Sequence, residues 1–223
     1  MQEGISEISQ QLKKYKEKGF SLFTSSSFQT HSTVLLHIIA QFDKTIPVYF
    51  LNTGYHFPET ISYKEQITKL FGIQTIDVFS STPKSMQKDA QDRLLFTSDP
   101  EYCCYLNKLQ PMEPLLDSFD VWINGVRADQ NENRKTFHTE EKTTRKAIRY
   151  HPILNWTNKR IYEYIRFCNI PKHPLDDRGY MSIGCEPCTR KLNFDMLDER
   201  SARWFGMNKT ECGLNTELVK KEL

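Results

Sequence analysis

The cysteines are the residues of this chain whose type and spacing could do chemistry. Cys103 and Cys104 are adjacent, Cys185 and Cys188 form a C-x-x-C pair, and Cys212 stands alone near the end. The first four have the character of ligands to one metal centre, since thiolates bind soft metals. The lone thiol has the character of a nucleophile, which a thiolate can be. A thiolate cage with a separate reactive thiol indicates redox or sulfur chemistry.

The residues alone do not decide what the four paired cysteines bind, or whether two of them form a disulfide. Soft thiolates select zinc or an iron–sulfur cluster over hard cations. Spacing alone favours zinc, because structural zinc is commonly held by four cysteines. The adjacency of Cys103 and Cys104 favours the cluster, since neighbours rarely give two ligands to one small tetrahedral ion, whereas a cluster offers them different irons. A strained disulfide between these two neighbours is a third alternative.

Composition limits the partners and the compartment. The chain has 30 Lys and Arg against 28 Asp and Glu, so its bulk charge indicates no nucleic acid or other polyanion. No apolar run approaches the roughly 20 residues that span a bilayer, and the first residues lack the apolar region of a signal peptide. We therefore expect a cytoplasmic protein without membrane contact, in which thiols stay reduced. Paired cysteines there favour metal binding or catalysis, whereas Cys168, on an apolar helical stretch, is expected to be a buried apolar residue.

Strands and helices are expected to alternate along the chain. Hydrophobic periodicity predicts strands at 20–24, 46–51, 74–79 and 120–124, and helices at 3–18, 32–42, 58–70 and 158–168. This order predicts an α/β fold: a mainly parallel, twisted sheet with helices on both faces. Ligands of such sheets bind at the carboxyl ends of the strands. The loops at 25–31, 52–58 and 125–134 are therefore the places to look for a site.

The same pattern predicts one compact unit in two parts. An α/β domain is expected over residues 1–171, and it includes two of the four paired cysteines. A C-terminal extension over 172–223 carries the C-x-x-C pair and the lone cysteine. Residues 128–147, rich in charge and poor in large aliphatic side chains, are expected to form a mobile excursion.

The loop Ser25-Ser26-Ser27-Phe28-Gln29 joins an expected strand to an expected helix. Free N–H groups at a helix start attract anions, and serine hydroxyls add donors. The loop has neither the Gly-Lys pattern of a P-loop nor a Gly-x-Gly-x-x-Gly. Taken alone, it is better interpreted as a helix cap and turn, because serine is a preferred capping residue.

Several motifs together carry a family resemblance over residues 20–216. The serine loop is followed by L-N-T-G-Y-x-F-P-E-T at 51–60, by W-x-x-G-x-R-x-x-Q-x-x-x-R at 122–134, and by R-W-F-G and K-T-E-C-G-L at 203–214. In this order they resemble the phosphosulfate reductase branch of the adenine nucleotide alpha-hydrolase fold. The Cys-Cys and Cys-x-x-Cys pairs are similar to those of its iron–sulfur branch, the assimilatory adenylyl-sulfate reductases.

The resemblance implies that the α/β domain over residues 1–171 binds a nucleotide, and it implies a reaction and a set of site residues. Adenosine 5′-phosphosulfate would be reduced to sulfite and AMP, within assimilatory sulfate reduction and cysteine biosynthesis. Cys212 would form an S-sulfocysteine that thioredoxin reduces. A [4Fe-4S] cluster on Cys103, Cys104, Cys185 and Cys188 would act structurally and electrostatically. Family members often form homo-oligomers, which is also expected here. The residues that would bind the substrate are Ser25, Ser26, Ser27, Phe28, Gln29, Thr53, Gly54, Lys108, Arg127, Arg134, Arg200 and Arg203.

The chain departs from the family pattern at three asparagines, and other functions stay open. Asn52 stands where Asp is common, Asn107 where Arg is frequent, and Asn215 where His commonly follows Cys-Gly-Leu. One alternative is a reductase of the 3′-phosphorylated substrate, or of both substrates. Another is an ATP pyrophosphatase, although that branch usually has Ser-Gly-Gly-x-Asp-Ser in the first loop. The third is a zinc-stabilised binding module without catalysis.

Overall fold

The structure is a computed structural model that describes residues 2–191, 202–204, 206, 207, 209 and 211–218. Its centre is a six-stranded sheet in the order β3-β2-β1-β4-β6-β5. Neighbouring strands are parallel except β5 and β6, which pair antiparallel. The strands are β1 (Leu22–Ser25), β2 (Val48–Leu51), β3 (Thr75–Val78), β4 (Val121–Ile123), β5 (Glu140–Lys142) and β6 (Ile148–Tyr150). The predicted α/β class with a mainly parallel sheet is confirmed.

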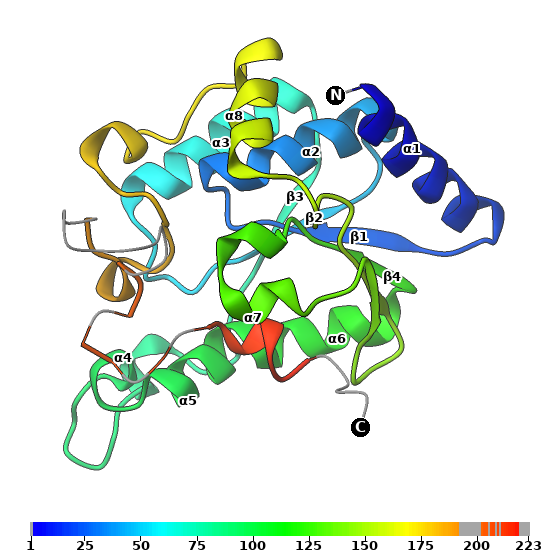
Figure 1. Cartoon of the computed structure of the whole chain (residues 1–223). Coiled ribbons are helices and arrows are strands. Elements are labelled where there is room, and N and C mark those ends of the chain that lie inside the picture. The colour runs from blue at the N-terminus through cyan, green and yellow to red at the C-terminus, as the bar shows by residue number, and fades with distance from the viewer. Residues whose placement is uncertain (1, 192–201, 205, 208, 210, 219–223) are drawn as a thin grey trace.

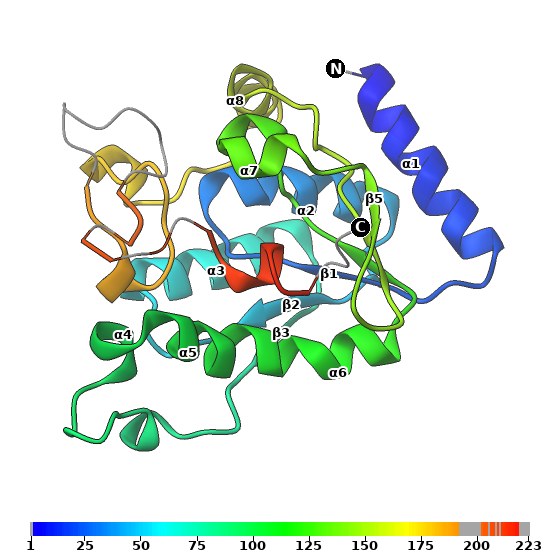
Figure 2. The same ribbon diagram turned by 60° about the horizontal axis from the view of Figure 1, so that its bottom comes forward.

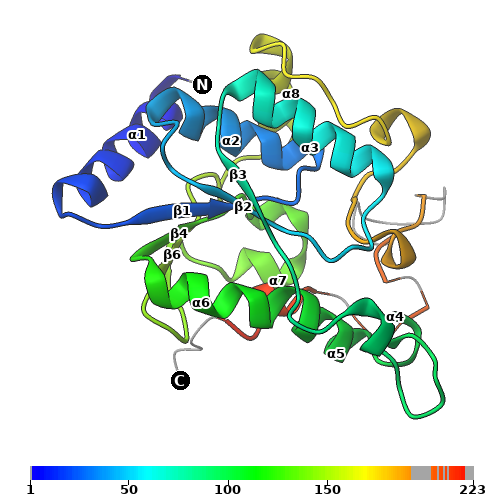
Figure 3. The same cartoon turned by 180° about the vertical axis from the view of Figure 1, so that it is seen from behind.

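Helices cover both faces of the sheet. One layer holds α1, α2, α3 and α8, and the opposite layer holds α4, α5 and α6 (Figures 1 and 3). The short helix α7 leads from β4 toward β5. The helix bounds are α1 (Gln2–Glu17), α2 (Thr30–Phe42), α3 (Pro58–Phe71), α4 (Leu95–Ser98), α5 (Pro100–Cys104), α6 (Gln110–Ser118), α7 (Glu132–Lys135) and α8 (Asn158–Phe167).

An apolar core lies between the sheet and each of the two helix layers, because successive side chains of a strand point to opposite faces. From β4, Val121 and Ile123 join the core that packs against α1, α2, α3 and α8. Trp122, between them, joins the core beneath α6, where Phe23 also lies. The neighbouring central strands β1 and β4 are thus buried on both sides, as parallel strands usually are.

The strand order places the site. From β1 the chain builds outward through β2 and β3, and it then returns to add β4 and β6 on the other side of β1. A crevice at the carboxyl ends of the strands is expected where the order reverses. At this point the Trp122 indole donates a hydrogen bond to Ser25 Oγ over 2.8 Å, which joins the end of β1 to β4.

Two stretches contain elements that the sequence analysis did not anticipate. Residues 100–118 form α5, a π-helical turn (Tyr105–Leu109) and α6 in direct succession. In the expected mobile excursion at 128–147, the structure instead has α7 and β5, and β5 pairs with β6. No described helix is both long and apolar enough to cross a membrane.

Candidate functional site

A cavity of about 180 Å³ opens where β1 and β2 end. Its wall is formed by the serine loop, the end of β2, the π-helical turn, α7, the C-x-x-C segment and the C-terminal tail around Cys212, of which 209 and 211–218 are described. None of the described lining residues is acidic, so the cavity suits an anion. The lining residues are Ser25, Ser26, Ser27, Gln29, Phe50, Leu51, His56, Lys108, Arg134, Ile183, Gly184, Cys185, Arg203, Trp204, Cys212, Leu214 and Asn215.

The serine loop is fixed from inside. Phe28 has a φ of 52° and a fully buried side chain, which packs edge-on against Phe50 at 5.7 Å between ring centroids. It therefore supports the loop from the core, whereas the three serines and Gln29 face the cavity. Ser26 Oγ accepts a hydrogen bond from the Phe28 N–H over 3.1 Å. The Gln29 side chain accepts one from the Ile183 N–H over 3.2 Å, so the loop is tied to the C-x-x-C segment.

The four paired cysteines line one smaller cavity beside the first. All four are buried. Burial, together with the neighbouring thiolates, raises the pKa of Cys103 to about 12 and that of Cys188 to about 11. Thr53 also lines this cavity, with its hydroxyl 3.3 Å from the Cys185 sulfur. Within the described ranges, no group of three or more His, Cys, Asp or Glu side chains has the arrangement to hold a metal ion.

Lys108 lines both cavities and so lies between the cysteines and the candidate anion site. Burial lowers its pKa, but the thiolates of Cys185, Cys104 and Cys212 outweigh burial, and its pKa lies above the ordinary value. No carboxylate of the described residues forms an ion pair with it. The position of Lys108 follows from an irregularity in the helical stretch. Pro111 has no N–H to donate to the carbonyl four residues earlier, and the turn that carries Lys108 is π-helical.

Arg203 is the second cation of the cavity wall. Its guanidinium lies so close to Gly184 that a Cβ there would be 2.2 Å from an arginine nitrogen. Its Nε donates to the Cys188 carbonyl over 3.3 Å, and its guanidinium carbon lies 4.7 Å from the centroid of the Trp204 ring. Gly184 therefore leaves the space in which the arginine crosses the C-x-x-C segment.

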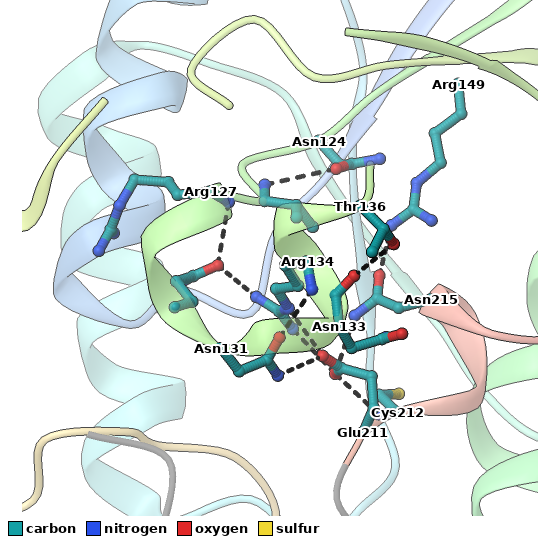
Figure 4. Close-up of polar contacts among 12 residues, drawn as sticks. Asn124, Arg127, Asn131, Asn133, Arg134, Thr136, Arg149, Glu211, Cys212 and Asn215 are labelled. Carbon is teal, nitrogen blue, oxygen red and sulfur yellow. Dashed lines mark hydrogen bonds and ion pairs between the residues drawn. The ribbon is translucent and has the colours of Figure 1, made fainter. Parts of the chain in front are cut away.

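Of the predicted substrate residues that the structure describes, four do not line this cavity: Phe28, Thr53, Gly54 and Arg127. Arg127 is only 1% exposed and pairs with Asp129 over 2.9 Å, and its guanidinium points away from the tail (Figure 4). Gly54 is exposed, with a φ of 67° that glycine adopts without strain. Arg200 lies outside the described residues. The substrate roles of all twelve predicted residues stay predictions.

The tail brings Cys212 to the cavity from the other end of the chain. It lies between α7 and α6 (Figure 2). Cys212 is half-buried and packs with Cys185, Cys188 and Trp204. On one side of the thiol, Lys209 contacts Glu101 at the start of α5. On the other side, Glu211 forms an ion pair with Arg134 of α7 (Figure 4).

Sequence reasoning missed several residues of the wall. His56 lines the cavity and lies within L-N-T-G-Y-H, where it occupied a variable position. Burial lowers its pKa to about 4, so its imidazole is neutral near pH 7. Asn215, which departs from the family pattern, also lines the cavity. Their place beside motif residues was the signal that could have found them.

Comparison with known proteins agrees with this architecture. The family model described as "Phosphoadenosine phosphosulfate reductase domain" matches residues 21–191. A protein of Chelativorans sp. strain BNC1 named adenosine 5′-phosphosulfate reductase is 37% identical over 91% of this chain and 81% of its own length. One of the same name from Oceanobacillus iheyensis is 35% identical over 91% and 85%.

Solved structures share the fold at low identity. Phosphoadenylyl-sulfate reductase from Candida auris, in a phosphate complex, matches with a TM-score of 0.64 and 19% identity, covering 83% of this chain and 96% of that one. FMN adenylyltransferase from Candida glabrata, in complex with FMN and an ATP analogue, matches with a TM-score of 0.54 and 14% identity, over 80% and 61%. Together, the matching family model and the similarity to curated relatives along most of its length show that the chain belongs to the phosphoadenosine phosphosulfate reductase family.

Proposed function

We propose that this protein reduces adenosine 5′-phosphosulfate to sulfite and AMP, with Cys212 as the nucleophile. The observation that carries the proposal is the meeting of Cys212 with Lys108, Arg203 and the serine loop around one cavity free of acidic lining residues in its described part. These elements come from three separate parts of the chain, since Arg203 and Cys212 lie only nine residues apart. The relatives named adenosine 5′-phosphosulfate reductase support the choice of substrate.

The first step is attack of the Cys212 thiolate on the sulfate sulfur. A sulfur–sulfur bond forms, the bond from that sulfur to the bridging phosphate oxygen breaks, and AMP leaves with the electron pair. The enzyme then carries an S-sulfocysteine. The charge leaving on AMP favours nearby cations, and Arg203 and Lys108 are the two cations of the wall without a described carboxylate partner. Arginine suits bidentate contact with sulfate or phosphate oxygens.

The second step needs an external dithiol, for which we propose thioredoxin. One of its thiolates attacks Cys212 Sγ, sulfite leaves with the electron pair, and a mixed disulfide forms. The second thiol of the donor then attacks, which frees Cys212 and leaves the donor as a disulfide. The pair of electrons that reduces the sulfate group thus comes from the dithiol. We assign the reaction to the cytoplasm, where such dithiols are kept reduced.

We further propose that Cys103, Cys104, Cys185 and Cys188 hold a [4Fe-4S] cluster. Their shared, buried cavity supports this proposal, as does Lys108 beside it, because a four-thiolate cluster is anionic and a nearby cation offsets that charge. The cluster would supply a fixed negative charge and a covalent tie between α5 and the C-x-x-C segment. Zinc is the alternative occupant, and it is colourless because its d shell is full.

Anaerobic purification, a visible spectrum and metal analysis test the cage, and a sulfite assay with thioredoxin tests the reaction. We expect a brown protein with about four irons per chain and sulfite release that depends on thioredoxin. Mass analysis after reaction without a reductant should find a sulfonate adduct on the peptide containing Cys212. Competition between adenosine 5′-phosphosulfate and its 3′-phosphorylated form measures selectivity. A protein that never acquires the adduct would contradict the proposal.

A further inference from the structure

We propose that Glu211 is a positioning residue that, with Asn215, holds Cys212 over the cavity by tying the tail to α7 and to β6. The inference rests on the proposed function, since it concerns the pose of the nucleophile. Glu211 does not line the cavity, and only 8% of it is exposed. It therefore acts on the reaction through the residue next to it, Cys212.

The first tie is a buried ion pair to α7. The Glu211 carboxylate accepts hydrogen bonds from Arg134 Nε over 2.8 Å and Nη2 over 2.9 Å, in the bidentate form. The two side chains are only 5% and 8% exposed. Asn131, the residue that caps α7, donates to the same carboxylate over 2.9 Å. The carboxylate thus receives donors from the first turn of one short helix.

The same carboxylate also controls the backbone of the nucleophile. The Cys212 N–H donates to Glu211 Oε1 over 2.8 Å. The next residue, Gly213, packs tightly, because a Cβ there would lie 2.8 Å from Leu109 of the π-helical turn. Cys212 therefore cannot shift while the Glu211 carboxylate stays in place and Gly213 stays against the turn that carries Lys108.

The second tie runs through Asn215 to β6. Asn215 donates from its amide to Glu211 Oε1 over 3.0 Å, and its amide oxygen accepts from Arg149 (Figure 4). Arg149 is 1% exposed, and its guanidinium carbon lies 4.6 Å from the Trp122 ring centroid. A neutral amide can accept from one neighbour while donating to the other. Asn215 therefore links a buried cation of the sheet to the Glu211 carboxylate.

Loss of these ties should affect chemistry and leave nucleotide binding intact. The serine loop and Arg203 line the cavity, whereas Glu211 does not. Removing the carboxylate leaves the buried Arg134 without its partner, and breaking a buried pair in this way is strongly unfavourable. The closed pose of the tail loses that stabilisation, so Cys212 spends less time at the cavity and more time accessible to solvent.

The experiment compares wild-type holoenzyme with Glu211→Gln, Asn215→Ala and a control, Glu132→Gln. The control removes an exposed ion pair to Lys135 on the same helix, α7. Three quantities are measured: the Kd of AMP, the single-turnover rate of sulfonate formation on the Cys212 peptide, and the rate at which iodoacetamide labels that peptide. For Glu211→Gln we expect at least about a tenfold slower sulfonation and faster labelling, since a buried pair is lost. AMP should bind no more weakly, and the control should match wild type.

The outcomes separate this inference from the proposed function. If wild type forms the adduct and Glu211→Gln forms it equally fast with unchanged labelling, the positioning role is refuted while the proposed function stands. If wild type forms no adduct, the proposed function itself fails.

A double-mutant cycle with Arg134→Gln checks that the two residues act through each other, in which case their effects are not additive. Should Glu211→Gln not fold, Asn215→Ala decides the question. Faster labelling of the Cys212 peptide and slower sulfonation in that variant support the positioning role of Glu211 and Asn215, and wild-type values overturn it.

Discussion

The serine loop after β1 and the tail around Cys212 line the same cavity, but they are held by different forces. The loop grows out of the sheet, with the Ser26 N–H donating to the Tyr49 carbonyl over 3.2 Å and Phe28 buried in the core. Beside Cys212 the tail is held by polar side-chain contacts, those of Lys209 and Glu211, whereas Leu214 and Leu218 further along pack in the core beneath α6. Apolar burial does not depend on one partner, whereas an ion pair is lost when either member moves. Under the proposed function, the serine loop would therefore be preformed for binding. The segment beside Cys212 could be released to meet a dithiol donor, as catalytic segments that must open often are.

Replacing the thiol at the centre of the tail should have the largest effect. Cys212→Ser is expected to abolish sulfite formation, because a hydroxyl does not replace a thiolate nucleophile. AMP binding and the iron content should stay at wild-type levels, since the serine loop and the four-cysteine cavity are unchanged. The measurement is a sulfite assay beside calorimetry with AMP. Sulfite production at the wild-type rate would reject the assignment of Cys212.

Loss of one of the four paired cysteines should have the next largest effect. Cys103→Ser is expected to lose most of its iron and its brown colour, because a cluster loses one of its four ligands. Cys168→Ser is the matched control, since Cys168 packs against the core that involves α8, away from the cage. Iron analysis and a visible spectrum after anaerobic purification make the comparison. An iron-replete Cys103→Ser protein would remove this residue from the cage.

Truncating the support of the serine loop should destabilise the whole fold. Phe28→Ala is expected to lower the free energy of unfolding by about 3–5 kcal/mol, the usual range for a buried aromatic side chain, and to weaken AMP binding. Glu211→Gln should leave AMP binding intact, so the pair of variants separates the two regions. Denaturant unfolding and calorimetry give both quantities. Equal AMP affinity in Phe28→Ala and wild type would show that the loop does not depend on the core.

Acid should lower the free energy of unfolding through a buried histidine, His173. His173 is fully buried, and burial lowers its pKa to about 4. The imidazole accepts from the Leu175 N–H, and its other nitrogen lies 3.0 Å from the Thr60 hydroxyl. The unfolded chain, with a histidine pKa near 6.5, binds the proton more readily than the folded one. Stability is therefore complete above about pH 6.5 and falls as the pH drops toward 4.

The corresponding measurement is urea unfolding at pH 7.5 and pH 5. We expect His173 to contribute a loss of about 1–2 kcal/mol over this interval. His173→Gln should reduce the pH dependence, and His138→Gln, at an exposed histidine, is the control for removing a histidine elsewhere. A pH dependence that is the same in all three proteins would show that His173 is not held neutral by burial.

The smallest effect is expected at the surface of α7. Glu132→Gln removes an ion pair in which both side chains are more than half exposed. Such pairs contribute little because water screens them and holding two long side chains costs entropy. Unfolding and sulfite release should match wild type. A clear loss of activity in this variant would mean that the whole of α7, rather than the buried Arg134–Glu211 pair, controls the tail.

Sequence patterns predict the central strands and the first helices because apolar runs and helix-end residues are local features of the sequence. The apolar stretch at 32–42 predicts α2, and proline at the start with glycine after the end marks α3. The helical stretch at 100–118 was missed because Pro111 and Pro114 interrupt the pattern that indicates a helix. Strands β5 (Glu-Glu-Lys) and β6 (Ile-Arg-Tyr) contain charged residues and lack the apolar run that predicts the equally short β4.

By itself, the sequence determined which residues are equipped for chemistry: four cysteines in two pairs, a lone cysteine in the tail, and a serine loop after a strand. Residue type and spacing carry that information, because a thiol or a hydroxyl has its chemistry wherever it stands. The tertiary structure alone decided what each charged side chain does. Arg127 pairs with Asp129, Arg134 pairs with Glu211, and Lys108 lies between the two cavities. The physical reason is that a charge acts through neighbours distant in the sequence, and only folding brings those neighbours within reach.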